Sequence, residues 1–184
     1  MHKHLDRIVS EVSIAFAFVV LTGFQSVKKA TDPISSGVIP KEKKELLNKI
    51  VGRWITQANI HARHGRPASK AIASDVWQWS PDGNFLVHTA YGIREKGSFG
   101  AIQITGYNSK TGDFDIYNFN QDGSISTETL TICNNIWIWK SKEVRTTGEM
   151  DSTCKILSVK HEITEDGKTY ELFMEGFLTK CSDF

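Results

Sequence analysis

The chain has 184 residues, of which 40% are apolar and 23% are charged, and its formal net charge is +1. This length supports one domain with a sizeable core and is too short for two comfortable ones. The near-neutral charge excludes nucleic acid as an expected partner, because nucleic-acid binding requires a dense basic surface.

The first predicted element is a secretory signal. A basic start, an apolar run at residues 12–24 and a polar stretch with Pro and Ser follow in the order of a signal peptide. The run is short for a membrane helix, which needs about 20 residues. We therefore expect residues 1–27 to be the signal peptide of an exported (periplasmic or secreted) protein, or alternatively an uncleaved anchor that is its only membrane contact. Residues 28–39 are expected to be a linker.

Residues 40–184 are expected to form one domain that begins with a short helix. Apolar residues recur on one side of residues 40–52, Pro40 suits a first helical position, and Gly52 suits a helix end. From Trp54 onward the apolar period changes from 3.6 to 2, which is typical of strands. The rest of the chain keeps this strand periodicity.

One hairpin decides which aromatic side chains are expected to face inward. Pro81, Asp82 and Gly83 predict a three-residue loop that pairs Ser80 with Asn84. The resulting inner face contains Trp77, Trp79, Phe85, Val87, Thr89 and Tyr91, and the outer face contains Gln78 and His88.

Short turns separate the later strands as well. Asn134 and Asn135 predict a two-residue turn that pairs Cys133 with Ile136, and a late strand has an apolar face that includes His161. No helix is long enough for a parallel crossover. These features predict an all-β, antiparallel up-and-down barrel of about 8–10 strands, since closure removes the exposed edges of a long meander. A two-sheet sandwich is the alternative.

Five stretches spread over the predicted domain carry a resemblance to known proteins. They are "LLNKIVGRW" (46–54), "WQWSPDGNFLVH" (77–88), "ITGYNSKTGDFDIYNFNQDG" (104–123), "NIWIW" (135–139) and "EGFLTK" (175–180). In order and spacing they resemble a bacterial family of uncharacterised lipocalin-like domains, which are calycin-type β-barrels.

The resemblance implies a lipocalin-like barrel and little about chemistry. In lipocalins a Gly-x-Trp motif follows a short helix and the Trp helps to close one barrel end, and Gly52 and Trp54 match this motif. Lipocalins proper also stack a late Arg against that Trp, and no residue of this chain is assigned to that role. The family has no agreed activity, so the resemblance implies no catalytic residue and no cofactor.

The inward aromatic side chains are candidates for lining a ligand site, and the alternative is that they fill a packed core. With one histidine they form the predicted ligand-binding set: Trp54, Trp77, Trp79, Tyr91, Trp137, Trp139, His161 and Tyr170. His161 is either a polar group of the pocket, a general base or a haem or metal ligand, or a neutral core histidine. His61 and His64 lack a third ligand nearby, so we predict no metal site.

The cysteines do not indicate a particular chemistry. Cys133, Cys154 and Cys181 form an odd set without zinc-site spacing. One pair could be bridged in an exported protein, and the alternative is that all three are small buried hydrophobic residues.

The leading functional hypothesis is an exported barrel that binds a small hydrophobic or amphipathic ligand in its lumen without chemistry. The first alternative is a lumen enzyme of the isomerase, cyclase or hydrolase type that uses His161 with a carboxylate. The second is a packed barrel that acts as a protein interaction module. The sequence indicates no oligomeric state.

Overall fold

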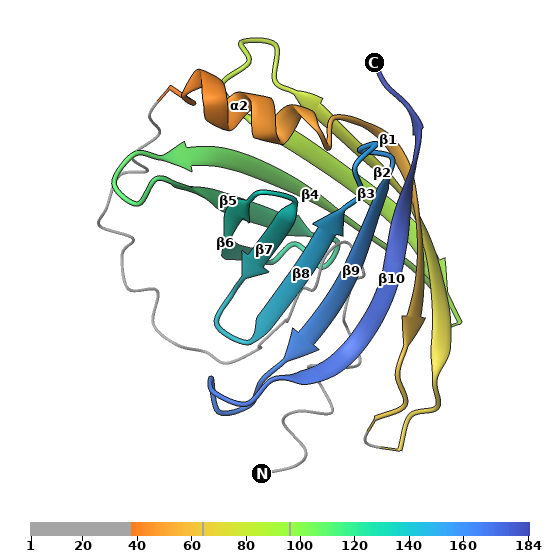
Figure 1. Ribbon diagram of the computed structural model, residues 1–184. Helices are drawn as coiled ribbons and strands as arrows, with labels where there is room; N and C mark the ends of the chain where they lie inside the picture. Colours follow the sequence, from red (N-terminus) through yellow and green to blue (C-terminus); the bar gives the residue numbers. More distant parts are fainter. Residues whose placement is uncertain (1–37, 64, 96) are drawn as a thin grey trace.

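The computed structural model describes residues 38–63, 65–95 and 97–184, and the expected signal peptide and nearly all of the expected linker lie outside these ranges. Within these ranges, one short helix precedes ten strands (Figure 1). The elements are α2 (Lys41–Asn48), β1 (Gly52–Ile60), β2 (Ser69–Trp79), β3 (Leu86–Arg94), β4 (Gly97–Asn108), β5 (Asp113–Asn120), β6 (Ile125–Cys133), β7 (Ile136–Lys140), β8 (Val144–Met150), β9 (Ile156–Ile163) and β10 (Glu171–Ser182).

The ten strands form one closed antiparallel barrel. Each strand pairs with the next along the chain, and β1 pairs with β10 to close the ring. The predicted all-β up-and-down barrel is therefore confirmed. Alternate residues face the interior, and closure leaves no open sheet edge.

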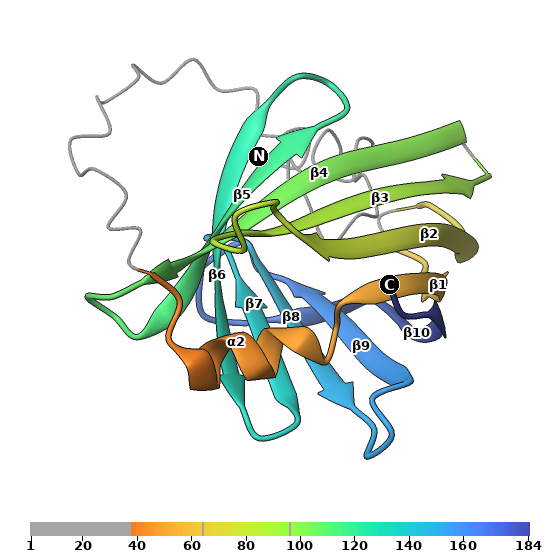
Figure 2. The same cartoon turned by 90° about the horizontal axis from the view of Figure 1, so that it is seen from above.

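Helix α2 covers one end of the barrel (Figure 2). The helix begins after Pro40 and ends at Asn48, and its buried Leu47 packs on the barrel core. Gly52 was expected to end the helix, but it opens β1 instead. The chain leaves the helix through a turn in which Ile50 N–H donates to the carbonyl of Leu47 and Val51 N–H to that of Asn48.

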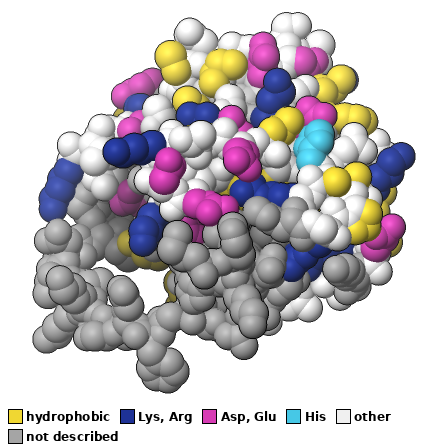
Figure 3. All heavy atoms as spheres, turned by 90° about the horizontal axis from the view of Figure 1, so that it is seen from below, with side chains coloured by type: hydrophobic (Ala, Val, Ile, Leu, Met, Phe, Trp, Pro, Cys, Tyr) yellow, Lys and Arg dark blue, Asp and Glu magenta, His cyan; other side chains and the backbone are white. Residues whose placement is uncertain are grey.

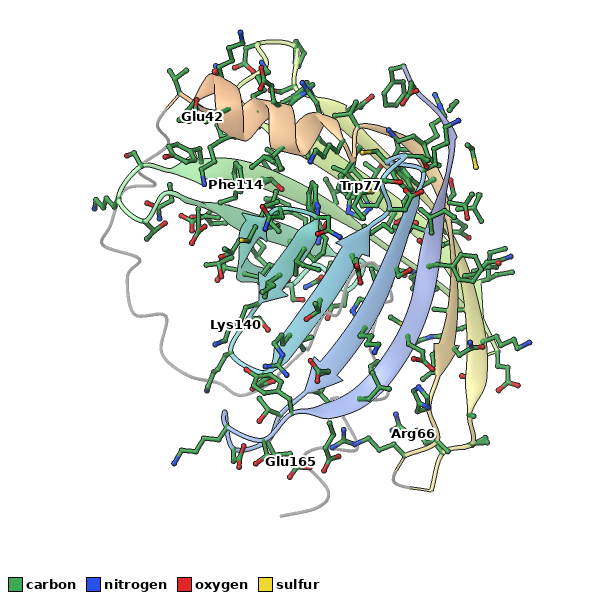
Figure 4. The ribbon with its side chains drawn as sticks, in the orientation of Figure 1. Glu42, Arg66, Trp77, Phe114, Lys140 and Glu165 are labelled. Carbon is green, nitrogen blue, oxygen red and sulfur yellow. The ribbon has the colours of Figure 1, made fainter. Side chains whose placement is uncertain are left out.

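The two larger apolar clusters of the interior lie at different heights of the barrel, and a small third one pairs Ala90 with Ala101. The larger lies beneath α2, where Figure 4 shows Trp77 and Phe114, while Arg66 and Glu165 lie at the opposite end. Its buried members are Ile39, Leu47, Ile50, Trp54, Trp77, Leu86, Phe114, Ile116, Leu130, Ile132, Trp137, Trp139, Met150, Leu157, Val159 and Leu178. The second cluster consists of Ala58, Ala71, Ala73, Phe99, Phe173 and Met174.

The β2–β3 hairpin differs from the expected register by one residue on β3. Trp79 pairs with Leu86, and Trp77 pairs with His88. The reason lies in the loop, where Asp82 accepts hydrogen bonds from the Ser80 hydroxyl and from the backbone and side-chain amides of Asn84. Asn84 is thereby held in the loop and does not pair with Ser80.

This shift reverses the faces of β3. Leu86 and His88 point inward and are buried, whereas Tyr91 is 62% exposed on the outer wall. The predictions that Tyr91 faces inward and that His88 faces outward were therefore wrong. Other registers were correct: Cys133 pairs with Ile136 as expected.

The Gly-x-Trp motif lies where α2 meets the barrel. Trp54 is buried, and its indole N–H donates to the carbonyl oxygen of Ile50 at 2.8 Å. Lys180 of β10 pairs with Trp54 and places its ammonium 5.2 Å from the centre of a Trp54 ring. A lysine from the last strand thus lies over the tryptophan of the first strand.

The cysteines are unbridged. Cys133 and Cys181 are exposed and Cys154 is half-buried, so the interpretation of all three as buried hydrophobic residues was wrong. Seen from below, the described surface intersperses basic, acidic and apolar side chains (Figure 3).

Candidate ligand site in the barrel interior

Buried polar side chains form a belt around the interior. They face inward because strand alternation gives every second residue to the lumen. The members are Thr56, Asp75, His88, Gln103, Thr105, Asn118, Asn120, Glu128, Thr146 and His161, all buried. Sheet register places Trp77, His88, Gln103, Asn118 and Ser126 directly opposite one another on successive strands from β2 to β6.

His88 is held on three sides. Its Nε2 lies 3.0 Å from Oδ1 of Asp75, and its Nδ1 hydrogen-bonds Oε1 of Gln103. The ring of Trp77 stacks on the imidazole, with centroids 3.9 Å apart and planes 6° from parallel. The Thr56 hydroxyl donates to the other oxygen of Asp75 at 2.5 Å.

Glu128 continues the belt on β6. Gln103 Nε2 donates to Oε1 of Glu128 at 3.2 Å. Burial raises the pKa of Glu128 to about 8, and a hydrogen bond from Asn118 offsets only part of this effect. At neutral pH this interior carboxyl group is therefore mostly protonated.

The hydrogen-bond directions restrict the role of His88. Because the Gln103 amide donates to Glu128, its oxygen must accept the Nδ1 proton of His88. One further proton lies between Nε2 and Asp75. Both ring nitrogens are thus engaged, which is typical of a positioned structural group and unfavourable for a general base.

Three buried polar atoms on β5 and β6 have no hydrogen-bond partner. They are Oδ1 of Asn118, Oδ1 of Asn120 and Oγ of Ser126. The Asn118 and Asn120 side chains are 2% and 8% exposed. Buried polar groups are normally paired, so these oxygens can accept a hydrogen bond from a further donor in the lumen.

His161 lies on β9, away from the β2–β6 row. Its Nδ1 is 2.7 Å from the Thr146 hydroxyl on β8. Burial lowers the pKa of His161 to about 3, so the imidazole is neutral at physiological pH. Asp75 and His88 form a carboxylate–histidine pair in the interior.

The predicted ligand-binding aromatics divide into two groups. Four of them belong to the packed cluster beneath α2: Trp54, Trp77, Trp137 and Trp139. Trp79 is half-buried at the rim, where its indole N–H donates to Asn48 of α2. Tyr170 is in the loop before β10 with the outward Arg145 guanidinium 4.2 Å from its ring centre, so neither Tyr170 nor Tyr91 joins them.

Sequence reasoning missed the belt between His88 and Glu128. A usable signal was Asp75, which shares the parity of Trp77 on β2 and so had to face inward with it. A buried carboxylate needs a partner. The register that pairs Trp77 with His88 provides that partner, and the predicted register does not.

Two depressions lie in the outer wall. One of about 550 Å³ includes Ile72, Ile93 and Phe177, and one of about 430 Å³ includes Lys160 and Glu175. Neither surrounds the polar belt. In residues 38–63, 65–95 and 97–184, no group of three or more His, Cys, Asp and Glu side chains could hold a metal ion, and no helix of this part is long and apolar enough to cross a membrane.

The fold and the interior define the class: a closed ten-stranded antiparallel barrel with a helix over one end and a buried polar belt. Residues 39–176 match the family described as "Protein of unknown function (DUF1579)". Because this match covers most of the chain, the protein belongs to that family.

The fold is also seen in a solved structure. The chain is similar to the crystal structure of Rv2717c from M. tuberculosis, with a TM-score of 0.56 and 12% sequence identity. The alignment covers 75% of this chain and 96% of the mycobacterial chain. At this identity the similarity shows a shared fold alone. No curated protein matches the chain.

Proposed function

We propose that the protein is a lipocalin-like carrier that binds a small amphipathic molecule in its lumen without chemistry. The observation that carries this proposal is the set of unpaired buried acceptors on Asn118, Asn120 and Ser126. Leaving such atoms without a partner costs about 1–3 kcal/mol each. A bound molecule that pairs with them would remove this cost.

Binding is favoured over catalysis by the state of the two interior histidines. His88 uses both ring nitrogens within the belt, and buried His161 accepts a proton only with difficulty. A general base works best with a pKa near the operating pH. The lumen-enzyme alternative through His161 is therefore disfavoured.

The relation to calycins is part of this proposal. It is supported by the helix that precedes the barrel, by Trp54 at the covered end and by the late cation Lys180 over its ring. We also propose export, because residues 1–27 have the order of a signal peptide. N-terminal sequencing of the secreted or periplasmic protein tests this proposal. Recovery of the full chain in the cytosolic fraction would contradict export.

The test of lumen binding uses the environment-sensitive apolar probe N-phenyl-1-naphthylamine with the full chain. We expect saturable probe fluorescence and energy transfer from the interior tryptophans. An Ala101→Met variant adds bulk at a buried inward position of β4, whereas Ile102→Met changes the neighbouring outward position. We expect weaker binding only for the Ala101 variant.

Two outcomes would contradict lumen binding. The first is that the probe does not bind and native mass spectrometry shows no co-purifying molecule. This result would favour the interaction-module alternative. Equal loss in the Ala101 and Ile102 variants would place the probe outside the lumen. Thermal melts of both variants establish that they are folded.

A further inference from the structure

We propose that the ligand's polar end is a protonated amine, held by Asn118, Asn120, Ser126 and Glu128. This inference rests on the proposed lumen binding and deepens it by naming the chemical class of the ligand. The four side chains lie on the adjacent strands β5 and β6 and face the interior.

The chemistry of the unpaired atoms selects a donor. Oδ1 of Asn118 and Oδ1 of Asn120 are amide oxygens, which accept hydrogen bonds and cannot donate them. A hydroxyl oxygen, that of Ser126, completes the set. An ammonium group carries three donors and no acceptor, which matches a set made of oxygen acceptors. A carboxylate or phosphate would bring further acceptors.

Register brings a carboxyl group to the same place. Ser126 is opposite Asn118, and Glu128 is the next inward residue of β6. Glu128 is two positions after Ser126 on the same face, so it is a diagonal neighbour of Asn118 across the strand pair. The amine would therefore meet one carboxyl group as well as neutral oxygens, which provides charge compensation for burying a cation.

Glu128 is the group that would respond to this charge. Without a cation beside it, burial raises its pKa to about 8. An ammonium ion would favour the carboxylate form. Binding at neutral pH would then release the carboxyl proton to solvent, leaving an ammonium–carboxylate pair in the interior.

The surroundings of Glu128 contain few other charges. On β4 and β5 its neighbours are the amides of Gln103 and Asn118, and the inward residues of β7 are tryptophans. Beyond Gln103 lies the His88–Asp75 pair. His161 is on β9, and Arg94 lies at the far end of β3.

The opposite wall presents apolar side chains to a tail. In the ring of ten strands, β5 and β6 lie across from β10 and β1. Those strands carry Ala58, Phe173 and Met174 of the second apolar cluster. A molecule with an amine at one end and an alkyl chain at the other would contact both walls.

The test compares three probes of one length by isothermal titration calorimetry: n-octylammonium, n-octanol and octanoate. We expect n-octylammonium to bind at least about tenfold more tightly than n-octanol, and octanoate to bind most weakly. Titration in two buffers of different ionisation enthalpy should show release of about one proton per ligand at pH 7 and little at pH 10.

Variants assign the effect to the site. Glu128→Gln should weaken the binding of n-octylammonium by about 30-fold or more, because it removes the charged partner. It should also abolish the proton release that accompanies binding. It should leave n-octanol binding nearly unchanged. Asn118→Leu removes an acceptor and should also weaken the amine selectively. Glu149→Gln is the matched control, because Glu149 is exposed on the outer face of β8. It should change neither the affinity for n-octylammonium nor the proton release.

The outcomes separate this inference from the proposed function. Equal affinities for n-octylammonium and n-octanol would overturn the amine assignment while lumen binding stands. Tighter binding of octanoate than of n-octylammonium would do the same. Displacement of n-octylammonium by millimolar calcium or potassium would also overturn it and indicate a metal-cation site. Failure of all three probes and of the naphthylamine probe would overturn lumen binding itself.

Discussion

His88 is an interior residue whose polar partners, Asp75 and Gln103, are themselves buried in the barrel. The pair with Asp75 is almost completely buried, with side-chain exposures of 1% and 2%. In such surroundings the two groups satisfy each other, and neither can turn to water if its partner is removed. The stacked Trp77 ring further restricts the imidazole.

Replacing His88 with Leu should lower the free energy of unfolding by about 3–5 kcal/mol, because buried Asp75 would keep only the Thr56 hydroxyl as a partner. The measurement is urea unfolding followed by circular dichroism. His61→Leu is the matched control, since His61 pairs with Glu175 at 3.5 Å and both side chains are more than 40% exposed. That change should cost less than about 1 kcal/mol. Similar losses in the two variants would contradict the buried network.

His161 should remain neutral under mildly acidic conditions. Burial lowers its pKa to about 3, so its ring resonances should not titrate between about pH 5 and pH 8, where an ordinary histidine does. Two-dimensional NMR of the histidine rings measures this directly. A midpoint for His161 near 6.5 would show that its ring reaches solvent.

At the scale of elements, close backbone approach between β1 and β10 closes the barrel. Gly176 of β10 pairs with Ala58 of β1. A side chain at Gly176 would overlap the backbone oxygen of Gln57, and its Cβ would lie 2.8 Å from Cα of Ala58. These are backbone atoms of the closing strand pair, so side-chain rotation cannot relieve the overlap.

Gly176→Ala should therefore destabilise the protein by about 1–3 kcal/mol or more, through forced separation of β1 and β10. Amide hydrogen exchange should show faster exchange in these two strands. Gly106→Ala in β4 is the control, because its added Cβ would make only ordinary contact with the Phe85 ring at 3.4 Å. Unchanged exchange in β1 and β10 would contradict the tight closure.

At the scale of the whole molecule, two buried groups give stability a pH dependence with two limbs. The pKa of Glu128 is raised from 4.5 to about 8, so stability falls as pH rises through this window. The pKa of His161 is lowered from 6.5 to about 3, so stability falls as pH decreases through that window. The opposing slopes cancel in part between 4.5 and 6.5.

Urea-unfolding free energies should therefore be highest at about pH 5–6 and fall on both sides. Glu128→Gln should remove much of the alkaline limb, and His161→Gln much of the acid limb. Glu45→Gln on the exposed face of α2 should change neither. If the Glu128 variant loses as much stability between pH 6 and pH 9 as the parent protein does, Glu128 is not the group responsible.

The sequence by itself determined the class of fold. Strand periodicity and short turns predicted an antiparallel meander after a short helix, because these features depend on neighbouring residues. The register of β6 and β7 was predictable for the same reason, since a two-residue turn sets it.

Only the tertiary structure decided which residues form the candidate site. Side-chain hydrogen bonds of Asp82 hold one additional residue in a loop, and this shift by one position turned His88 inward and Tyr91 outward. Asn118 and Glu128 meet through pairings between strands, which periodicity within a strand does not reveal. A strand's alternation sets which residues share a face, but the loop and the partner strand decide which face is the interior.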